Sequence, residues 1–521
     1  MEGFWSGSLA KFMGIPYATP PTGPLRWQPP QPAKCWKEPV FYATNYSSIC
    51  PQFGSGAFSP VVQSEDCLYL NVYVSKFGSP GLKPVLFWIH GGSLVVGSAY
   101  SYNVDLLAEK LDVVIVSINY RLNVFGFLAL DELNSNDERK VSGNYGILDQ
   151  LLALKWVQNN IAAFGGDPKL VTLIGQSSGG TSIFALLSSP ASQGLFSRAI
   201  SLSGSANITM DLKTASIQNR QFLTLSNCSN LNPTDTLSCI YSLNTTTTLQ
   251  STPPGYNFLP LGYPFPDNKA VGMNYPGVVI VDGVTVTLPF KEAIKRALID
   301  VPLIIQGMSH ELALFSPYSF RNETTAAFKS LIYNGIAKGF GPLAGSIITD
   351  IYFNKADNDY IFYKLLSDLG LQCASSYLAI SSNKNYRSPI YISFVDTPPS
   401  TPYYSPFNQL SVNLPFHMWD YMAGAGDWNI FCYPGCTQCC NWQPQAADQA
   451  LGDTLRRMWY QFAVTGKLVD CKRYNDVPGF PLDLNWCHPK AEGLENAVNA
   501  RKIECDALWR VGFDDKEWWC D

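Results

Sequence analysis

The chain has 521 residues, a net charge of −5 and a mean hydropathy near zero, and 46% of its residues are hydrophobic. A chain of this length and composition can bury a large core. No apolar run approaches the roughly 18 residues of a membrane-spanning helix, and the 36 Lys and Arg residues are scattered. We therefore expect neither a transmembrane segment nor a nucleic-acid partner.

Cysteine usage indicates an oxidising compartment, because the chain has 14 cysteines. Five N-x-[ST] triplets agree with this and give the glycosylation candidates Asn45, Asn207, Asn227, Asn244 and Asn322. We expect a secreted or lumenal protein; an intracellular protein with unpaired thiols is the alternative. The first residues, MEGFWSGSLAKFMG, have no signal-peptide pattern, so we expect that the chain lacks its signal peptide.

Strand and helix patterns alternate along most of the chain. The first eighty residues are expected to form loops over short strands. Short apolar runs bounded by turn residues predict strands at 84–90, 112–120, 170–176, 199–205, 301–307 and 390–396, and helical patterns cover 146–165 and 178–189. This alternation predicts a doubly wound α/β sheet, in one domain over 1–521 with insertions between about 207 and 289.

A possible nucleophile lies in LVTLIGQSSGG, which reads as a strand, a turn and the start of a helix. Residues 175–179 fit G-x-S-x-G, with Ser177 at the centre. In that motif the serine occupies a strained turn that leaves its hydroxyl exposed above the sheet. The N–H of Ser178 would then face the oxyanion that develops in the reaction. A simple Gly/Ser-rich turn is the alternative, and the flanking strand and helix favour a nucleophile.

A serine nucleophile needs a base and an orienting acid, and the chain has only four histidines. The expected chain order is serine, acid, histidine. His90 precedes the serine, and His488 lies in a Cys-flanked tail segment, so His310 and His417 remain.

The positions of these two histidines relative to the expected strands indicate which of them is the base. His417 follows the strand expected at 390–396, and Glu311 follows the end of the strand at 301–307. We assign Glu311 as the acid and His417 as the base, which leaves His310 as a bystander. The alternative for His417 is a histidine packed among aromatic residues and hydrogen-bonded to Asp420.

An oxyanion hole is expected in the sequence HGGS, residues 90–93, which closes the strand at 84–90. Its glycines allow backbone amides to face a ligand. A strand-terminating turn is the alternative reading of these residues.

The chain resembles the type-B carboxylesterase/cholinesterase family of α/β-hydrolases. The resemblance spans nearly the whole chain and rests on FMGIPYATPPTGPLRW (12–27), EDCLYLNVY (65–73), WIHGG (88–92), SINYRLNVFGFL (117–128), GNYGILDQLLALKWVQNNIAAFGGDP (143–168), GQSSGG (175–180) and RRMWYQFAVTGKL (456–468). The resemblance implies an α/β-hydrolase fold, a large mostly parallel sheet with helices on both faces. Because family proteins begin some way before the F-x-G-I-P-Y-A motif, we expect the leading strands to be absent here.

Site residues follow from the resemblance as well. It implies Ser177 as nucleophile, Glu311 as acid and His417 as base, with the oxyanion held by Gly92, Ser93 and Ser178. A small-molecule carboxylic ester is the implied substrate, and no metal or organic cofactor is needed.

The resemblance also implies three disulfides, which join Cys50 to Cys67, Cys228 to Cys239 and Cys373 to Cys505. Eight cysteines are extra: Cys35, Cys432, Cys436, Cys439, Cys440, Cys471, Cys487 and Cys520. The close thiols of CYPGCTQCC (432–440) fit a zinc site as an alternative, but we favour disulfides.

Several positions depart from the family pattern. Gln176 stands where Glu is frequent, and Ser93, Ser178 and Met418 stand where small residues are usual; MSHELA is one residue short of the usual acid motif. The tryptophan with which cholinesterases hold choline is absent, and Phe58 is a weaker cation–π partner. We therefore expect an ester hydrolase without choline specificity. A non-catalytic adhesion or structural member of the family is the rival hypothesis.

Overall fold

The computed structural model describes the whole chain apart from residues 37–38, 54–60, 257–277, 317–318, 354–356, 383–384, 408, 433–437, 439, 472–484, 499–500 and 514–521. Within the described residues, one eleven-stranded sheet runs through the molecule in the order β1-β2-β3-β5-β4-β6-β7-β8-β9-β12-β13. Strands β10 (Tyr403–Tyr404) and β11 (Ser411–Val412) pair separately.

The large sheet is parallel in its centre and antiparallel at its edges. Strands β5, β4, β6, β7, β8, β9 and β12 run parallel, whereas β1, β2 and β3 at one edge and β13 at the other are antiparallel to their neighbours. The bounds are β1 (Phe4–Ser6), β2 (Leu9–Pro16), β3 (Tyr69–Ser75), β4 (Lys83–Ile89), β5 (Val114–Ile118), β6 (Gly166–Gln176), β7 (Arg198–Leu202), β8 (Leu303–Met308), β9 (Ile390–Val395), β12 (Asn485–Lys490) and β13 (Gly493–Val498).

The central strands are apolar because both faces of the sheet are covered. The side chains of β5 and β8 are buried along their whole length. All six strands expected from the sequence are present, as β4 to β9, and the expected large, mostly parallel sheet is confirmed.

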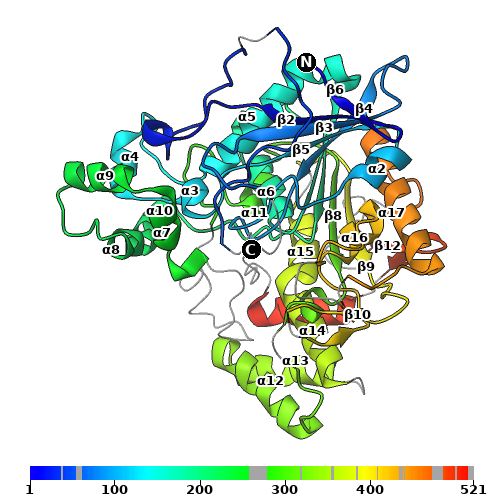
Figure 1. Ribbon diagram of the computed structural model, residues 1–521. Coiled ribbons are helices and arrows are strands. Elements are labelled where there is room, and N and C mark those ends of the chain that lie inside the picture. The colour runs from blue at the N-terminus through cyan, green and yellow to red at the C-terminus, as the bar shows by residue number, and fades with distance from the viewer. Residues whose placement is uncertain are drawn as a thin grey trace.

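Helices cover the two faces of this sheet (Figure 1). One face packs against α5 (Tyr145–Asn160), α6 (Ser178–Leu187) and α15 (Cys373–Ser381), and the other against α2 (Asp105–Lys110) and α17 (Ala446–Thr465), with α16 (Trp419–Ala425) packed on α17. Helices α5 and α6 are the two that the sequence predicts.

The other helices lie outside these layers. The segment expected as an insertion contains α7 (Leu212–Asn219), α8 (Gln221–Leu225), α9 (Pro233–Ser242) and α10 (Thr245–Gln250), which lie beside α3 (Asn123–Phe127) and α4 (Asp131–Asn136) in Figure 1. The remaining helices are α11 (Phe290–Lys295), α12 (Thr325–Phe340), α13 (Pro342–Tyr352), α14 (Asn358–Ser367) and α18 (Lys502–Leu508).

A buried ion pair fixes α5 to the end of β5. Asp149 on α5 is fully buried and accepts hydrogen bonds from Nε and Nη2 of Arg121, at 2.8 and 2.7 Å, and from the Arg121 backbone N–H at 3.0 Å. Among the described residues, Arg121 supplies all the hydrogen-bond donors given for this carboxylate. The contribution of the ion pair to stability therefore depends on the geometry of that one residue.

Five disulfides are formed among the described residues. Three are the pairs implied by the resemblance, and Cys432–Cys440 and Cys471–Cys487 are further pairs. The Cys432–Cys440 bond uses two of the thiols for which zinc was the alternative. Cys35 is exposed and unpaired, and Cys436, Cys439 and Cys520 lie outside the described residues.

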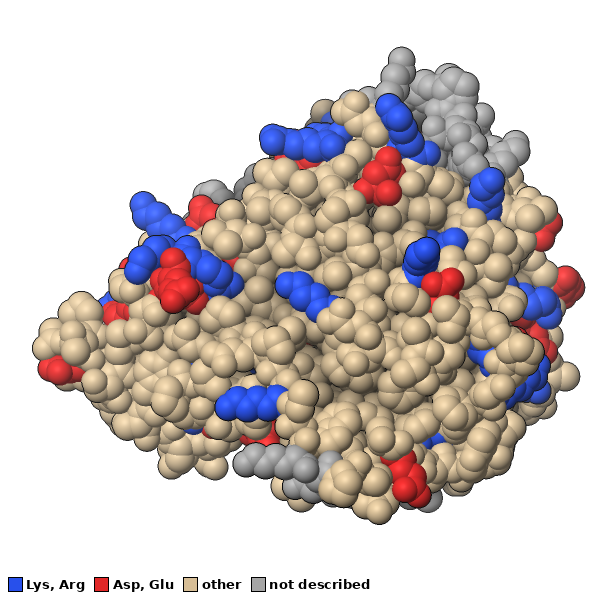
Figure 2. Space-filling model, turned by 90° about the horizontal axis from the view of Figure 1, so that it is seen from above, with Lys and Arg blue, Asp and Glu red and all other residues tan. Residues whose placement is uncertain are grey.

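The described helices include none that is both long and apolar enough to cross a bilayer. On the face seen in Figure 2, Lys and Arg alternate with Asp and Glu, and the coloured residues form no broad patch of one sign.

Candidate active site

The candidate site lies where the parallel strands end at their carboxyl edge. Ser177 directly follows β6, Ser203 directly follows β7, and Glu311 comes three residues after β8. Carboxyl ends of neighbouring parallel strands meet at one edge of a sheet, which is where ligands bind in open α/β sheets. The topology therefore gathers residues that are more than a hundred positions apart in sequence.

Ser177 occupies the sharp turn between β6 and α6. Its backbone has φ 59° and ψ −128°, a conformation that L-residues rarely adopt, and its N–H is held by the carbonyl of Leu202 at 2.8 Å. The turn requires close packing, since a Cβ on Gly179 would lie 2.1 Å from the carbonyl oxygen of Ile89. The structure thus explains why a glycine follows Ser178, and it leaves the serine 8% exposed.

Glu311 and His417 lie together, as the sequence predicts. Oε2 of Glu311 is 2.6 Å from Nδ1 of the His417 ring. In addition, the backbone N–H of His417 donates to the backbone carbonyl of Glu311. The carboxylate is fully buried, and its Oε1 accepts hydrogen bonds from Ser203 Oγ at 2.9 Å and from the Met308 N–H at 2.7 Å. Both oxygens of the carboxylate thus have partners, and the one that faces the ring is placed to accept a proton carried on Nδ1 of His417.

The rings of the other three histidines contact other groups. Burial lowers the pKa of His90 to about 4 and that of His310 to about 3, so both rings are neutral at pH 7. The ring of His90 stacks on Tyr120, and His310 Nδ1 lies 2.8 Å from Ser309 Oγ. His488 lies on β12, with Nδ1 3.5 Å from a carboxylate oxygen of Asp396.

The loop after β4 has the geometry that an anion-binding loop needs. Gly92 has φ +115°, and Ser93 and Leu94 have φ values of 54° and 59°. The loop is anchored by the Leu94 N–H, which donates to Ser178 Oγ at 3.1 Å. In the described part of the chain the N–H groups of Gly92 and Ser93 have no acceptor. Ser178 is the first residue of α6, where N–H groups lack an intrahelical partner.

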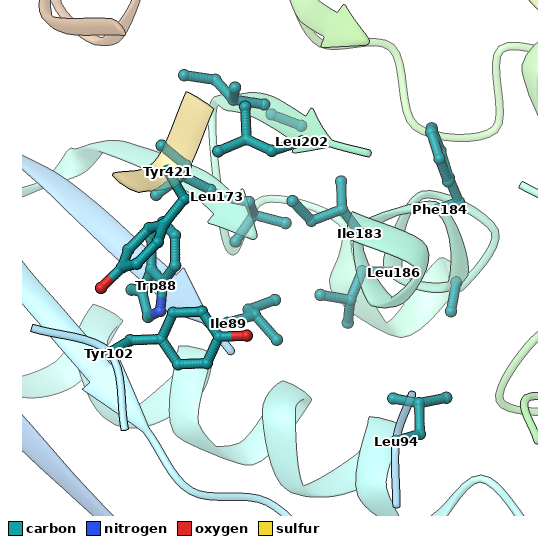
Figure 3. Close-up of a cluster of buried hydrophobic side chains, with 14 of the residues drawn as sticks. Trp88, Ile89, Leu94, Tyr102, Leu173, Ile183, Phe184, Leu186, Leu202 and Tyr421 are labelled. Atoms are coloured by element: carbon teal, nitrogen blue, oxygen red, sulfur yellow. The ribbon is translucent and has the colours of Figure 1, made fainter. Parts of the chain in front are cut away.

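The side chain of Gln176, the last residue of β6, reaches the ring of His417. Its Nε2 lies 3.2 Å from Nε2 of His417, and its Oε1 lies 3.4 Å from the hydroxyl of Tyr102. The same hydroxyl accepts the Gly91 N–H at 3.2 Å. In Figure 3 the ring of Tyr102 lies beside those of Trp88 and Tyr421, and its hydroxyl points toward Ile89 at the end of β4.

Asp420, the alternative partner of His417, bonds elsewhere. It is fully buried, and its carboxylate accepts hydrogen bonds from Gln306 Nε2 at 2.6 Å and from the Tyr421 N–H at 2.7 Å. Burial raises its pKa to about 6, and the charge of Glu311 adds to this. The Asp420 carboxyl group is thus close enough to Glu311 and His417 to interact with them electrostatically.

Two departures from the family pattern acquire a physical meaning in the structure. Met418 has φ +77°, a backbone conformation that glycine adopts without strain and that costs other residues about 1 to 2 kcal/mol. Ser178 places a hydroxyl where the family usually has a methyl group, and that hydroxyl holds the loop after β4.

Sequence reasoning did not find Ser203, Tyr102 or the contact of Gln176 with the base. One feature of the sequence could have indicated Ser203. It directly follows β7, and the neighbouring strand β6 leads into the G-x-S-x-G motif. Tyr102 lies in a loop with no pattern of its own. Phe58, the possible cation–π partner, lies outside the described residues. Within the described part, no three His, Cys, Asp or Glu side chains are grouped so that they could hold a metal ion.

Comparisons with known proteins show what the whole chain is similar to. The model of the carboxylesterase family matches residues 2–480. A para-nitrobenzyl esterase of Bacillus subtilis (strain 168) is 45% identical over 229 residues, which are 43% of this chain and 45% of that protein. Carboxylesterase 1C of Mus musculus is 36% identical over 337 residues, 62% of this chain and 57% of that protein. These curated relatives are therefore matched over less than two thirds of their length.

A solved structure of a PNB esterase superposes with a TM-score of 0.75 at 26% identity, over 97% of both chains. The likeness in fold thus extends beyond the region in which sequence identity is high.

Proposed function

Because the chain belongs to the carboxylesterase family, we propose that it hydrolyses small carboxylic esters through an acyl-enzyme formed on Ser177. The observation that carries this proposal is the 2.6 Å contact between Glu311 and His417 at the sheet edge where the Ser177 turn lies. A buried carboxylate that accepts the proton on Nδ1 leaves Nε2 as the basic atom of the ring, which is the arrangement a serine nucleophile needs.

The proposed reaction has two halves. His417 Nε2 takes the proton of the Ser177 hydroxyl while Oγ attacks the ester carbonyl carbon, and Glu311 stabilises the imidazolium that forms. The imidazolium then gives this proton to the departing alkoxide, so the alcohol leaves and an acyl group remains on Oγ. Water cleaves the acyl-enzyme by the same route, which returns the proton to Ser177 and releases the carboxylic acid.

The negative charge of each tetrahedral intermediate would rest on the N–H groups of Gly92, Ser93 and Ser178. The positive φ values of the loop after β4 and the N-terminal position of Ser178 on α6 support this role. Removing one such donor typically costs about 3 kcal/mol of transition-state stabilisation. No step of the proposed reaction uses a metal ion or an organic cofactor.

A cation-specific choline site is not part of the proposal. Gln176 is neutral at the position before the nucleophile, so it offers no carboxylate to a quaternary ammonium group. One relative is named para-nitrobenzyl esterase, and we propose neutral esters of comparable size as substrates.

The location proposed for the protein is secreted or lumenal. Five disulfides support it, as do the exposed side chains of Asn45, Asn227, Asn244 and Asn322. Asn207 is half-buried and its Oδ1 accepts a hydrogen bond from Thr209, so glycosylation is expected least there. We also propose that residues 1–521 act as one domain.

The test is fluorophosphonate labelling with peptide mass mapping, together with hydrolysis of short and long p-nitrophenyl esters. Label on Ser177 that is lost in Ser177→Ala and His417→Ala supports the proposal. A folded protein that neither takes the label nor hydrolyses any ester overturns it and favours the non-catalytic family member.

A further inference from the structure

The side chain of Gln176 lies between the oxyanion loop and the base. It is fully buried, with Nε2 at 3.2 Å from Nε2 of His417 and Oε1 at 3.4 Å from the Tyr102 hydroxyl. That hydroxyl in turn accepts the Gly91 N–H. A chain of hydrogen bonds therefore runs from the first glycine of the oxyanion loop to the proton-accepting atom of the base.

Chemistry fixes the direction of these bonds. Nδ1 of His417 donates its proton to the Glu311 carboxylate, so Nε2 of the neutral ring carries a lone pair and accepts. The group that faces Nε2 must then be the amide NH₂ of Gln176, and its Oε1 is left to accept from Tyr102. The orientation of the amide thus follows from the network around it.

The lone pair on Nε2 is the one that the Ser177 hydroxyl needs. An imidazole nitrogen has a single lone pair, and a well-formed hydrogen bond with one donor leaves little of it for a second. Gln176 directly precedes Ser177 in the chain, so in the proposed reaction the Ser177 hydroxyl has to share Nε2 with the amide that already lies against it.

We propose that Gln176 is a positioning residue that competes with Ser177 for His417, a role that rests on the proposed function. In the resting enzyme its amide N–H occupies Nε2 and favours the unprotonated ring. Proton transfer from Ser177 requires the amide to release this atom. A Glu at this position would offer a carboxylate instead, which cannot donate to Nε2 when ionised and favours the protonated ring.

The charges around the ring stay the same when the amide is removed. Glu311 faces Nδ1 from the segment after β8, and Asp420 acts on the ring from α16. The ring also packs against Phe315, with centroids 5.7 Å apart. A change in the titration of the base in a Gln176 variant therefore reports the lost amide donor.

The test variant is Gln176→Met, which keeps the length of the side chain and removes the amide. One hydrogen bond of ordinary strength shifts a titration by about 0.5 to 1 pH unit, so the acid limb of kcat/KM should move upward by that amount. At the alkaline plateau, the second-order rate of fluorophosphonate labelling should rise about 3- to 10-fold, because Ser177 no longer has to displace the amide.

Two further variants accompany it. Tyr102→Phe removes the group that holds Oε1 of Gln176 and should shift the acid limb in the same direction by a smaller amount. Gln150→Met makes the same exchange at a fully buried glutamine on α5 that bonds to Ser182, and its pH profile should match the wild type.

An acid limb in Gln176→Met that stays within about 0.1 pH unit of wild type, or that moves downward, overturns the proposal while leaving ester hydrolysis intact. A wild-type protein that takes no label contradicts the proposed function instead. In that case the titration of the His417 ring, followed by NMR in the same variants, still tests the contact, and an unchanged midpoint overturns it.

Discussion

Oε2 of Glu311 lies 2.6 Å from Nδ1 of His417, and Oε1 of the same carboxylate is held by Ser203 and Met308. Glu311→Gln keeps the shape of this group but can present an N–H to Nδ1, which moves the ring proton to Nε2 and removes the base. The expected loss in kcat is on the order of 10³- to 10⁴-fold, by analogy with the same change in serine proteases.

Hydrolysis of a p-nitrophenyl ester and a thermal melt measure this effect. Glu292→Gln on the exposed surface of α11 is the matched control and should keep full activity. A Glu311→Gln enzyme within 10-fold of wild-type activity would mean that another carboxyl group orients His417.

The hydroxyl of Ser178 holds the proposed oxyanion loop through the N–H of Leu94, at 3.1 Å. Ser178→Ala leaves that buried N–H without its acceptor, a loss of roughly 1 to 3 kcal/mol that falls on the loop expected to bind the transition state. We predict a decrease in kcat/KM of about 10-fold, with the label still on Ser177.

Steady-state kinetics with a short ester check this prediction. The control is Ser188→Ala, because the buried Ser188 hydroxyl has no partner among the described residues and its loss should change little. Equal kinetics for Ser178→Ala and wild type would show that the loop keeps its conformation without this bond.

The fold and the triad candidates were predictable because each carries a local signal. Apolar runs such as the one in β6 are long enough to mark buried strands, and the G-x-S-x-G spacing specifies a turn that only small neighbours permit, as the 2.1 Å approach at Gly179 shows. Four histidines and a fixed chain order then left few choices for the base.

The network around the triad candidates was beyond the sequence because it depends on tertiary packing. Tyr102 reaches Gln176 only because its ring is wedged beside Trp88 and Tyr421, which belong to β4 and α16. The short helices α7 to α10 were hidden for a related reason, since Thr- and Asn-rich segments carry weak periodicity and are held by caps such as Asn232 and Asn244.

The buried pair of Arg121 and Asp149 predicts a large effect on stability. Asp149→Asn leaves the guanidinium buried without a counter-charge, which typically costs about 3 to 5 kcal/mol in the free energy of unfolding. Urea denaturation measures it. Asp350→Asn is the control, since its ion pair with Lys329 is exposed and should change stability by less than about 1 kcal/mol. Comparable losses in both variants would contradict the assignment of the effect to burial.

Asp420 predicts a pH dependence of stability. Burial raises its pKa to about 6, while the same carboxyl in the unfolded chain titrates near 3.8. Between these values the folded protein holds a proton that the unfolded chain has released, so the contribution of Asp420 to stability is present below pH 4 and is lost as pH rises to 6. Two pH units correspond to a loss on the order of 2 to 3 kcal/mol.

Asp420→Asn removes this titration but keeps that of Asp368, whose pKa burial also raises to about 6. The measurement is urea unfolding of both proteins at intervals from pH 4 to 7. The free energy of unfolding of wild type relative to Asp420→Asn should fall steadily through this window and level off above pH 6. A difference that is constant with pH would mean that the Asp420 carboxyl is ionised in the folded protein throughout, with Gln306 and the Tyr421 N–H sufficient to stabilise its charge.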